Sequence, residues 1–77
     1  MNPDARAWAE RLRELNCPGN GKRHNAVARI LDENCFASIE SLRVADHPSE
    51  WPGATARLSS GEIDFLAEMC RKARIQV

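Results

Sequence analysis

The C-terminal segment 58-LSSGEIDFLAEMCRKAR-74 decides the fold expected for this chain of 77 residues. Ser59 and Glu62 form a capping-box pattern, in which each side chain bonds the backbone N–H of the other residue where a helix begins. Leu58 and Ile63 occupy the hydrophobic-staple positions around this cap. The segment therefore predicts a long last helix that begins near Ser59. Its apolar stripe consists of Ile63, Leu66, Met69 and Cys70.

The sequence before this segment predicts further helices and no β-strand. Asn2-Pro3-Asp4 is a helix opening, because Asn or Asp caps a helix and Pro suits its first turn. A helical stripe at i, i+4 and i+7 follows, formed by Trp8, Leu12 and Leu15. Segment 16–21 contains a proline and two glycines, which end this helix. No segment alternates apolar and polar residues with period two.

Shorter elements fill the middle of the chain. A second helix is expected over about Arg23 to Asn34, and Ser38 is expected to cap a short helix from Ile39 to Ala45. Segment 46–53 has two prolines within five residues, which limits it to a tight turn or one helical turn. In that segment we expect Trp51 to plug the end of the bundle rather than stand exposed as a partner anchor.

These segments together predict an all-α fold, a compact bundle of four to five helices with a long C-terminal helix. A chain of 77 residues forms one domain and buries only about 60% of the surface that its unfolded form exposes. It has little material to enclose a deep substrate cavity, which argues against an enzyme. The expected core consists of Trp8, Leu12, Leu15, Val27, Ile30, Leu31, Phe36, Ile39, Leu42, Leu58, Ile63, Leu66 and Met69.

Charge and cysteine content narrow the functional classes. The chain has 11 basic and 11 acidic residues, whereas binding to nucleic acid or to anionic membranes favours a positive excess. No apolar run reaches the roughly 20 residues of a membrane-spanning helix. Three cysteines are an odd number, and a secreted mini-protein normally uses an even set. We therefore expect reduced thiols in an intracellular protein, cytoplasmic or nuclear. The ending Ile75-Gln76-Val77 has no polar tail, which leaves open that the chain is a module of a longer protein.

Residues of the types that hold zinc or act as nucleophiles occur without the patterns that such sites need. Cys17, His24, Cys35 and His47 include no Cys-x-x-Cys pair and match no compact zinc-finger spacing. No local signal marks one cysteine as an activated nucleophile. We expect no metal, no cofactor and no catalytic residue, with Cys35 and Cys70 acting as small apolar side chains on helix faces.

The loop Gly19-Asn20-Gly21-Lys22-Arg23-His24 resembles a phosphate-binding loop only in part. It lacks the earlier Gly, has no Ser or Thr after the Lys, and follows no strand. A weaker function stays open, because a basic loop that enters a helix can hold a phosphate or a nucleic-acid backbone. The alternative is a solvated connector. Nucleic-acid contacts would come from two basic clusters, Lys22, Arg23 and His24 together with Arg71, Lys72 and Arg74.

The chain resembles the sterile alpha motif (SAM) family in order and spacing over most of its length. The resemblance lies in Trp8 within an opening helix and in the run 30-ILDENCFASIESL-42. In this run a helix ends on an apolar residue, an acidic and polar turn follows, and a short helix opens on Ser-Ile-Glu. The long helix from Ser59 completes the pattern. Other small folds of five helices, including death-like domains, have a similar outline.

SAM domains are mostly protein-interaction modules, and some self-associate. The resemblance implies an end surface at the start of the last helix, formed by Ser59, Ser60, Gly61, Glu62 and the side of the helix that carries Lys72. It also implies a middle surface centred on Asp46, Glu50 and Trp51. We therefore expect a non-catalytic SAM-like module that binds a second copy of itself (homotypic) or another protein (heterotypic). Nucleic acid is the alternative partner, and no membrane is expected.

Replacing Ser59 with Ala should lower the free energy of unfolding by about 1 kcal/mol, because it removes the hydroxyl that accepts the Glu62 N–H. Urea unfolding followed by circular dichroism measures the difference. Ser60→Ala is the matched control and should change the stability much less, because Ser60 lies one residue after the cap. Equal losses in both variants would contradict the capping box.

Overall fold

The computed structural model describes residues 1–75, which contain helices and no β-strand. Four are α-helices and two are short 3₁₀ helices: α1 (Pro3–Glu14), α2 (Gly21–Glu33), η1 (Ile39–Val44), η2 (Pro48–Glu50), α3 (Ala54–Arg57) and α4 (Ser60–Ile75). The expected all-α fold with a long C-terminal helix is confirmed. The chain ending Ile75-Gln76-Val77 left open that this is a module of a longer protein. Gln76 and Val77 lie outside the described residues.

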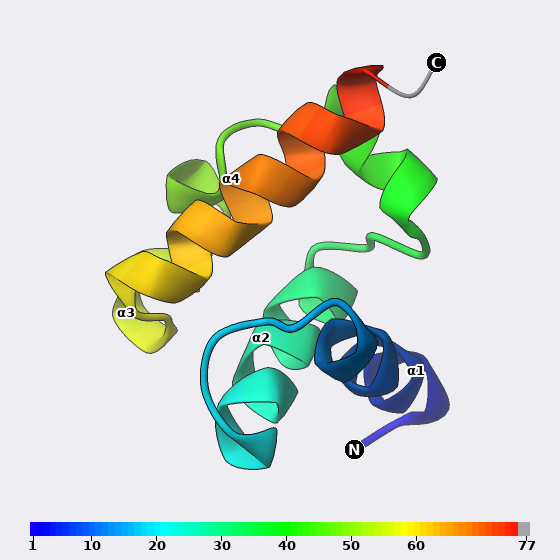
Figure 1. Cartoon of the computed structure of the whole chain (residues 1–77), viewed down its shortest axis with the longest axis vertical. Coiled ribbons are helices and arrows are strands. Elements are labelled where there is room, and N and C mark those ends of the chain that lie inside the picture. Colours follow the sequence, from blue (N-terminus) through cyan, green and yellow to red (C-terminus); the bar gives the residue numbers. More distant parts are fainter. Residues whose placement is uncertain (76–77) are drawn as a thin grey trace.

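The helices form two layers, as Figure 1 shows. α1 packs against α2 in one layer, and α4 packs along η1 in the other, with η2 and α3 also in contact with α4. The segment between Glu33 and Ile39 crosses from the first layer to the second. A single apolar cluster contains residues of both layers and joins them. The described chain measures 31 × 23 × 21 Å.

Asparagine caps explain where α1 and α2 begin. The Asn2 side-chain oxygen accepts the N–H of Ala5 at 2.8 Å. The Asn20 oxygen accepts the N–H of Arg23 at 3.2 Å, which satisfies one of the unpaired donors of the first turn. α2 therefore begins at Gly21, two residues before the expected start.

Both α1 and α2 end in a left-handed residue that is not glycine. Asn16 has φ 61° and Cys35 has φ 64°. After α2 the N–H of Phe36 bonds the carbonyl oxygen of Leu31 at 3.0 Å, the long hydrogen bond of a Schellman motif, and α1 ends in the same way. This turn places Cys35 in solvent. The expected burial of Cys35 on a helix face is therefore wrong, because the helix ends before it.

Most of the expected core is buried. The fully confirmed members are Trp8, Leu12, Val27, Ile30, Leu31, Leu42, Leu58, Leu66 and Met69. Phe36, Ile39 and Ile63 are half-buried and pack against this cluster. Leu15 was expected in the core and is 41% exposed. It is the C-cap of α1, so its side chain lies past the last turn that packs on α2.

Trp51 plugs the end of the bundle, as expected. Its side chain is 5% exposed, and its indole N–H donates to the carbonyl oxygen of Asp46 at 3.0 Å. Its ring centroid lies 4.7 Å from that of Phe36. Gly53 follows with φ 80° and leads into α3, a helix that the sequence analysis did not anticipate. Four residues are too few to show a helical period.

Replacing Cys35 with Gly should raise the free energy of unfolding by about 1 kcal/mol, because an L-residue in the left-handed region costs about 1–2 kcal/mol. Urea unfolding of the reduced protein measures the change. Asn16→Gly is the matched control, because Asn16 has φ 61°. It should raise the free energy of unfolding by less, since Asn tolerates this conformation better than Cys. A loss of stability in Cys35→Gly would show that the thiol makes a contact that outweighs the backbone strain.

Candidate functional site

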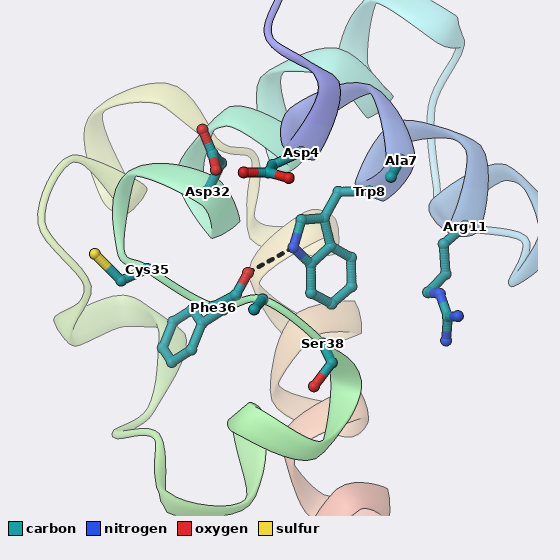
Figure 2. A pocket seen from close by; sticks show the side chains of 9 residues that line it. Asp4, Ala7, Trp8, Arg11, Asp32, Cys35, Phe36 and Ser38 are labelled. Atoms are coloured by element: carbon teal, nitrogen blue, oxygen red, sulfur yellow. Dashed lines mark hydrogen bonds between the residues drawn. The ribbon is translucent and has the colours of Figure 1, made fainter.

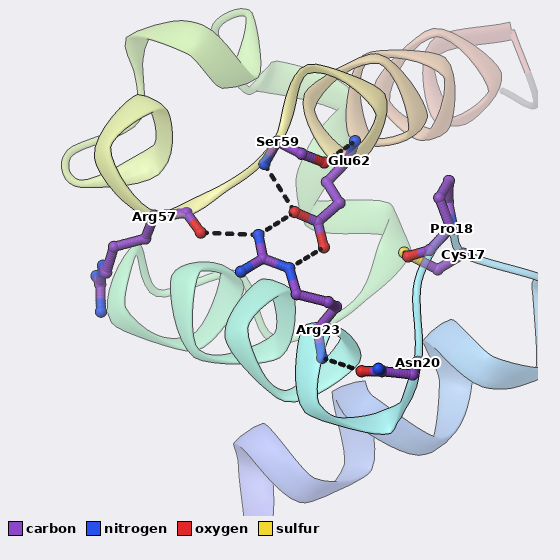
Figure 3. A network of polar contacts seen from close by, with 7 residues as sticks. All are labelled: Cys17, Pro18, Asn20, Arg23, Arg57, Ser59 and Glu62. Atoms are coloured by element: carbon purple, nitrogen blue, oxygen red, sulfur yellow. Dashed lines mark hydrogen bonds and ion pairs between the residues drawn. The ribbon is translucent and has the colours of Figure 1, made fainter.

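The start of α4 carries the capping box that the sequence predicts (Figure 3). The Ser59 N–H donates to Glu62 Oε1 at 2.7 Å, and the Glu62 N–H donates to Ser59 Oγ at 3.3 Å. The Glu62 side chain is 2% exposed, whereas Ser60 is exposed beside it. Glu62 therefore serves the helix end and does not offer its carboxylate to a partner.

Arg23 ties α2 to the start of α4. Its Nε donates to Glu62 Oε2 at 3.1 Å, its Nη2 bonds Glu62 Oε1, and the same Nη2 donates to the carbonyl oxygen of Arg57 at 3.0 Å. Burial raises the pKa of Glu62, but hydrogen bonds from Arg23 and Ser59 outweigh this effect and hold the pKa below its usual range. The buried carboxylate is thus ionised and paired.

The loop before α2 is closed by its own contacts. A Cβ on Gly19, which has φ 103°, would lie 2.8 Å from the Cβ of Arg23. His24 is buried, and its Nε2 lies 2.8 Å from the carbonyl oxygen of Cys17. Of the three basic residues assigned to this loop, Lys22 is the one that is exposed without a hydrogen bond among residues 1–75. The loop is thus packed on the start of α2, and Arg23 in that first turn binds Glu62 of α4.

The second basic cluster lies near the C-terminal end of α4. Arg71 pairs with Glu68 on the same helix, and Arg74 Nη1 lies 3.5 Å from the carbonyl oxygen of Ala45. Lys72 is exposed. In Figure 1 this end of α4 and the start of α2 lie at opposite ends of the longest axis. The two basic clusters therefore do not form the continuous face that a nucleic-acid interface would need.

The residues assigned to the middle surface divide between core and solvent. Asp46 and Glu50 are exposed, whereas Trp51 is buried. Val44, just before them, is 91% exposed, which the sequence analysis did not anticipate. The middle surface therefore presents two carboxylates and one aliphatic side chain.

A hollow of about 450 Å³ lies between α1 and the segment that follows α2 (Figure 2). Trp8 is almost fully buried at its wall, and its indole N–H donates to the carbonyl oxygen of Phe36 at 2.7 Å. The carboxylates of Asp4 and Asp32 lie on one side of Trp8, and Arg11 lies on the other. Because its indole N–H is already bonded and its ring is covered, Trp8 is not a stacking platform.

A second hollow is mostly apolar and lies where α1, η1 and α4 meet. It has a volume of about 240 Å³ and is lined by Leu15, Ile39, Phe65, Glu68, Met69 and Lys72. A more polar hollow of about 420 Å³ shares Ile39 with it and is lined by Arg11, Ser38, Ile39, Glu40, Arg43 and Ala73. We call the two together the α1–α4 groove.

The α1–α4 groove was not predicted from the sequence, because Leu15, Ile39 and Met69 were assigned to the core and Phe65 was given no role. Leu15 follows the last turn of α1, and Phe65 stands one position before the stripe residue Leu66. The position of Phe65 is a signal that its side chain faces the margin of the α4 stripe. The spacing of Leu15 places it on the α1 stripe, and only packing decides that it lies exposed beside Phe65.

The thiols do not form a nucleophilic or metal-binding constellation among residues 1–75. Desolvation and the nearby Glu62 raise the pKa of Cys17 to about 11, and burial raises the pKa of Cys70. Both thiols stay protonated at neutral pH, a weakly nucleophilic form. Within the described part of the chain no three His, Cys, Asp or Glu side chains gather in a metal-binding arrangement. In that same part, none of the helices has both the length and the apolar character needed to cross a bilayer.

Comparisons of this chain with protein-family models, with curated proteins and with solved structures give no match. The resemblance to the SAM family therefore stays a prediction.

Replacing Glu62 with Gln should lower the free energy of unfolding at neutral pH by about 1–2 kcal/mol, because the ionic hydrogen bonds from Arg23 are lost. The cost stays in this range because Arg23 is 42% exposed and water screens the pair. Glu33→Gln, in the exposed pair with Arg57, is the matched control and should cost less.

The Glu62 pair also predicts a pH dependence. The folded pKa is depressed, so the stabilisation is complete above the unfolded pKa of about 4.3 and is lost as pH falls through the folded value. Urea unfolding between pH 7 and pH 3 should show wild type and Glu62→Gln converging in acid. A constant difference across this range would contradict the ionised pair.

Proposed function

We propose that this chain is a non-catalytic helical module that binds protein, either a second copy of itself or another chain. The observation that carries the proposal is the α1–α4 groove, in which Leu15 is 41% exposed beside the half-buried Phe65 and Ile39. Apolar side chains grouped on a surface and rimmed by charge are typical of protein interaction sites. Val44 adds a second exposed apolar position.

The states of the reactive side chains support a non-catalytic module. The Cys17 thiol, with its pKa of about 11, is a poor nucleophile, and the Nε2 of the nearest histidine in the loop, His24, is hydrogen-bonded to a backbone carbonyl. The hollow beside Trp8 brings together carboxylates and one arginine without a nucleophile–base pair. These features favour recognition over chemistry.

The SAM resemblance implies which residues would contact a partner. Ser60 and Lys72 remain as exposed contact candidates on α4, and Asp46 and Glu50 remain on the middle surface. Glu62 and Trp51, the other two candidates, act behind these surfaces by holding the helix start and the bundle end. The proposal therefore uses fewer direct contacts than the resemblance implies.

We do not retain nucleic acid as a second candidate partner. Arg23 is committed to Glu62, and His24 is buried. Lys22, which stays exposed at the start of α2, and the cations near the end of α4 belong to opposite ends of the molecule, and the chain carries no net charge. We propose an intracellular location, cytoplasmic or nuclear, because Cys17, Cys35 and Cys70 are all free thiols.

A photoreactive benzoylphenylalanine in place of Leu15 tests the proposed function. Irradiation in cells that make the protein should yield a discrete crosslinked product, either a dimer of this chain or an adduct with another protein. Benzoylphenylalanine in place of the exposed Thr55 on α3 is the control and should give little crosslinked product. Lys72→Glu, a change at the groove rim, should reduce the product from position 15. Equal yields at both positions, or none, would refute the proposal.

A further inference from the structure

Val44 is the most exposed large apolar side chain of the described residues, at 91%. It lies at the end of η1, a 3₁₀ helix with about three residues per turn. In that geometry Ile39 and Leu42 fall on one face, whereas Val44 is turned by about 240° from Ile39. In this helix the Ile39 side chain therefore points toward the α1–α4 groove, and the Val44 side chain points away from it.

Two carboxylates follow Val44 along the chain. Asp46 and Glu50 are exposed and take part in none of the ion pairs among residues 1–75. Arg74 reaches the carbonyl oxygen of Ala45 at 3.5 Å, so one cation stands beside this group. We call Val44, Asp46 and Glu50 the acidic knob.

The α1–α4 groove has the opposite charge. Arg11, Arg43 and Lys72 line it, and none of them belongs to an ion pair among the described residues. The carboxylate of Glu68 at the same rim is neutralised by Arg71. Glu40 also lines the groove, which leaves three cations against one unpaired carboxylate.

We propose that the acidic knob of one copy of this chain docks into the α1–α4 groove of another. Val44 enters the apolar part between Leu15, Ile39 and Phe65, and Asp46 and Glu50 face the cations of the rim. The apolar part measures about 240 Å³, below the range of small-molecule sites, and suits one or two side chains of a protein. The inference rests on the proposed function and names its partner.

The two surfaces consist of different residues, and a wild-type pair can use them in two ways. If each copy docks its knob in the groove of the other, the pair closes as an isologous dimer. If only one knob is docked, the second knob and groove stay free, and the heterologous contact produces rings or open chains. Opposite charges at the rim also make the association weaker at high salt.

Two variants separate the surfaces, and both alter exposed positions. Val44→Lys removes the apolar tip of the knob and adds a charge that the basic rim repels. Leu15→Glu places a carboxylate in the groove opposite Asp46 and Glu50. Thr55→Lys and Thr55→Glu, at an exposed position of α3, are the matched controls for charge.

Sedimentation equilibrium across a concentration series, up to about 1 mM protein, measures the association. Wild type and both Thr55 variants should show a mass that rises with concentration and falls with added salt. For Val44→Lys and for Leu15→Glu, the self-association constant should fall at least about tenfold. An equimolar mixture of these two variants should form a 1:1 dimer and stop there, because it contains one intact knob and one intact groove.

The outcomes distinguish this inference from the proposed function. A wild-type chain that stays monomeric overturns the inference, as does association that both variants leave unchanged, or a mixture that fails to pair. If the chain is monomeric but benzoylphenylalanine at position 15 crosslinks a different protein, the groove binds another partner and the proposed function stands. If the chain is monomeric and nothing crosslinks, both are refuted.

Discussion

The ion pair between Arg23 and Glu62 is the interaction on which the arrangement of this small domain depends. Arg23 belongs to the α1–α2 layer and Glu62 belongs to the α4 layer, so the pair links the two layers beside the apolar cluster that they share. A carboxylate that is 2% exposed needs such a partner, because an isolated buried charge is costly. The loop before α2 also packs closely on Arg23, since a Cβ on Gly19 would lie 2.8 Å from the Cβ of Arg23.

This pair also decides which residues remain for function. Because Arg23 and Glu62 bind each other, neither side chain is free to contact a partner. The charges on the rim of the α1–α4 groove and on the acidic knob are outside this pair and remain exposed. Ile39 and Met69 belong to both the apolar cluster and the groove, whereas the exposed Leu15 and Val44 can be altered with less effect on the core.

η1 connects the two proposed surfaces. Six residues in a 3₁₀ helix place Leu42 in the core, Ile39 at the groove and Val44 in solvent. An α-helix of the same sequence would turn Val44 by a different angle, since its residues are spaced at 100° rather than about 120°. The shape of this short helix thus governs the direction in which Val44 leaves the core.

The sequence alone determined the fold class and the starts of α1 and α4, because capping acts over three or four residues. Ser59 with Glu62 and the apolar stripe after them needed no knowledge of the rest of the chain. Tertiary structure decided the exposure of Leu15 and Val44 and the pairing of Arg23 with Glu62, 39 residues away in the sequence. These depend on how two layers pack, and a pattern within one helix carries no information about the surface of another.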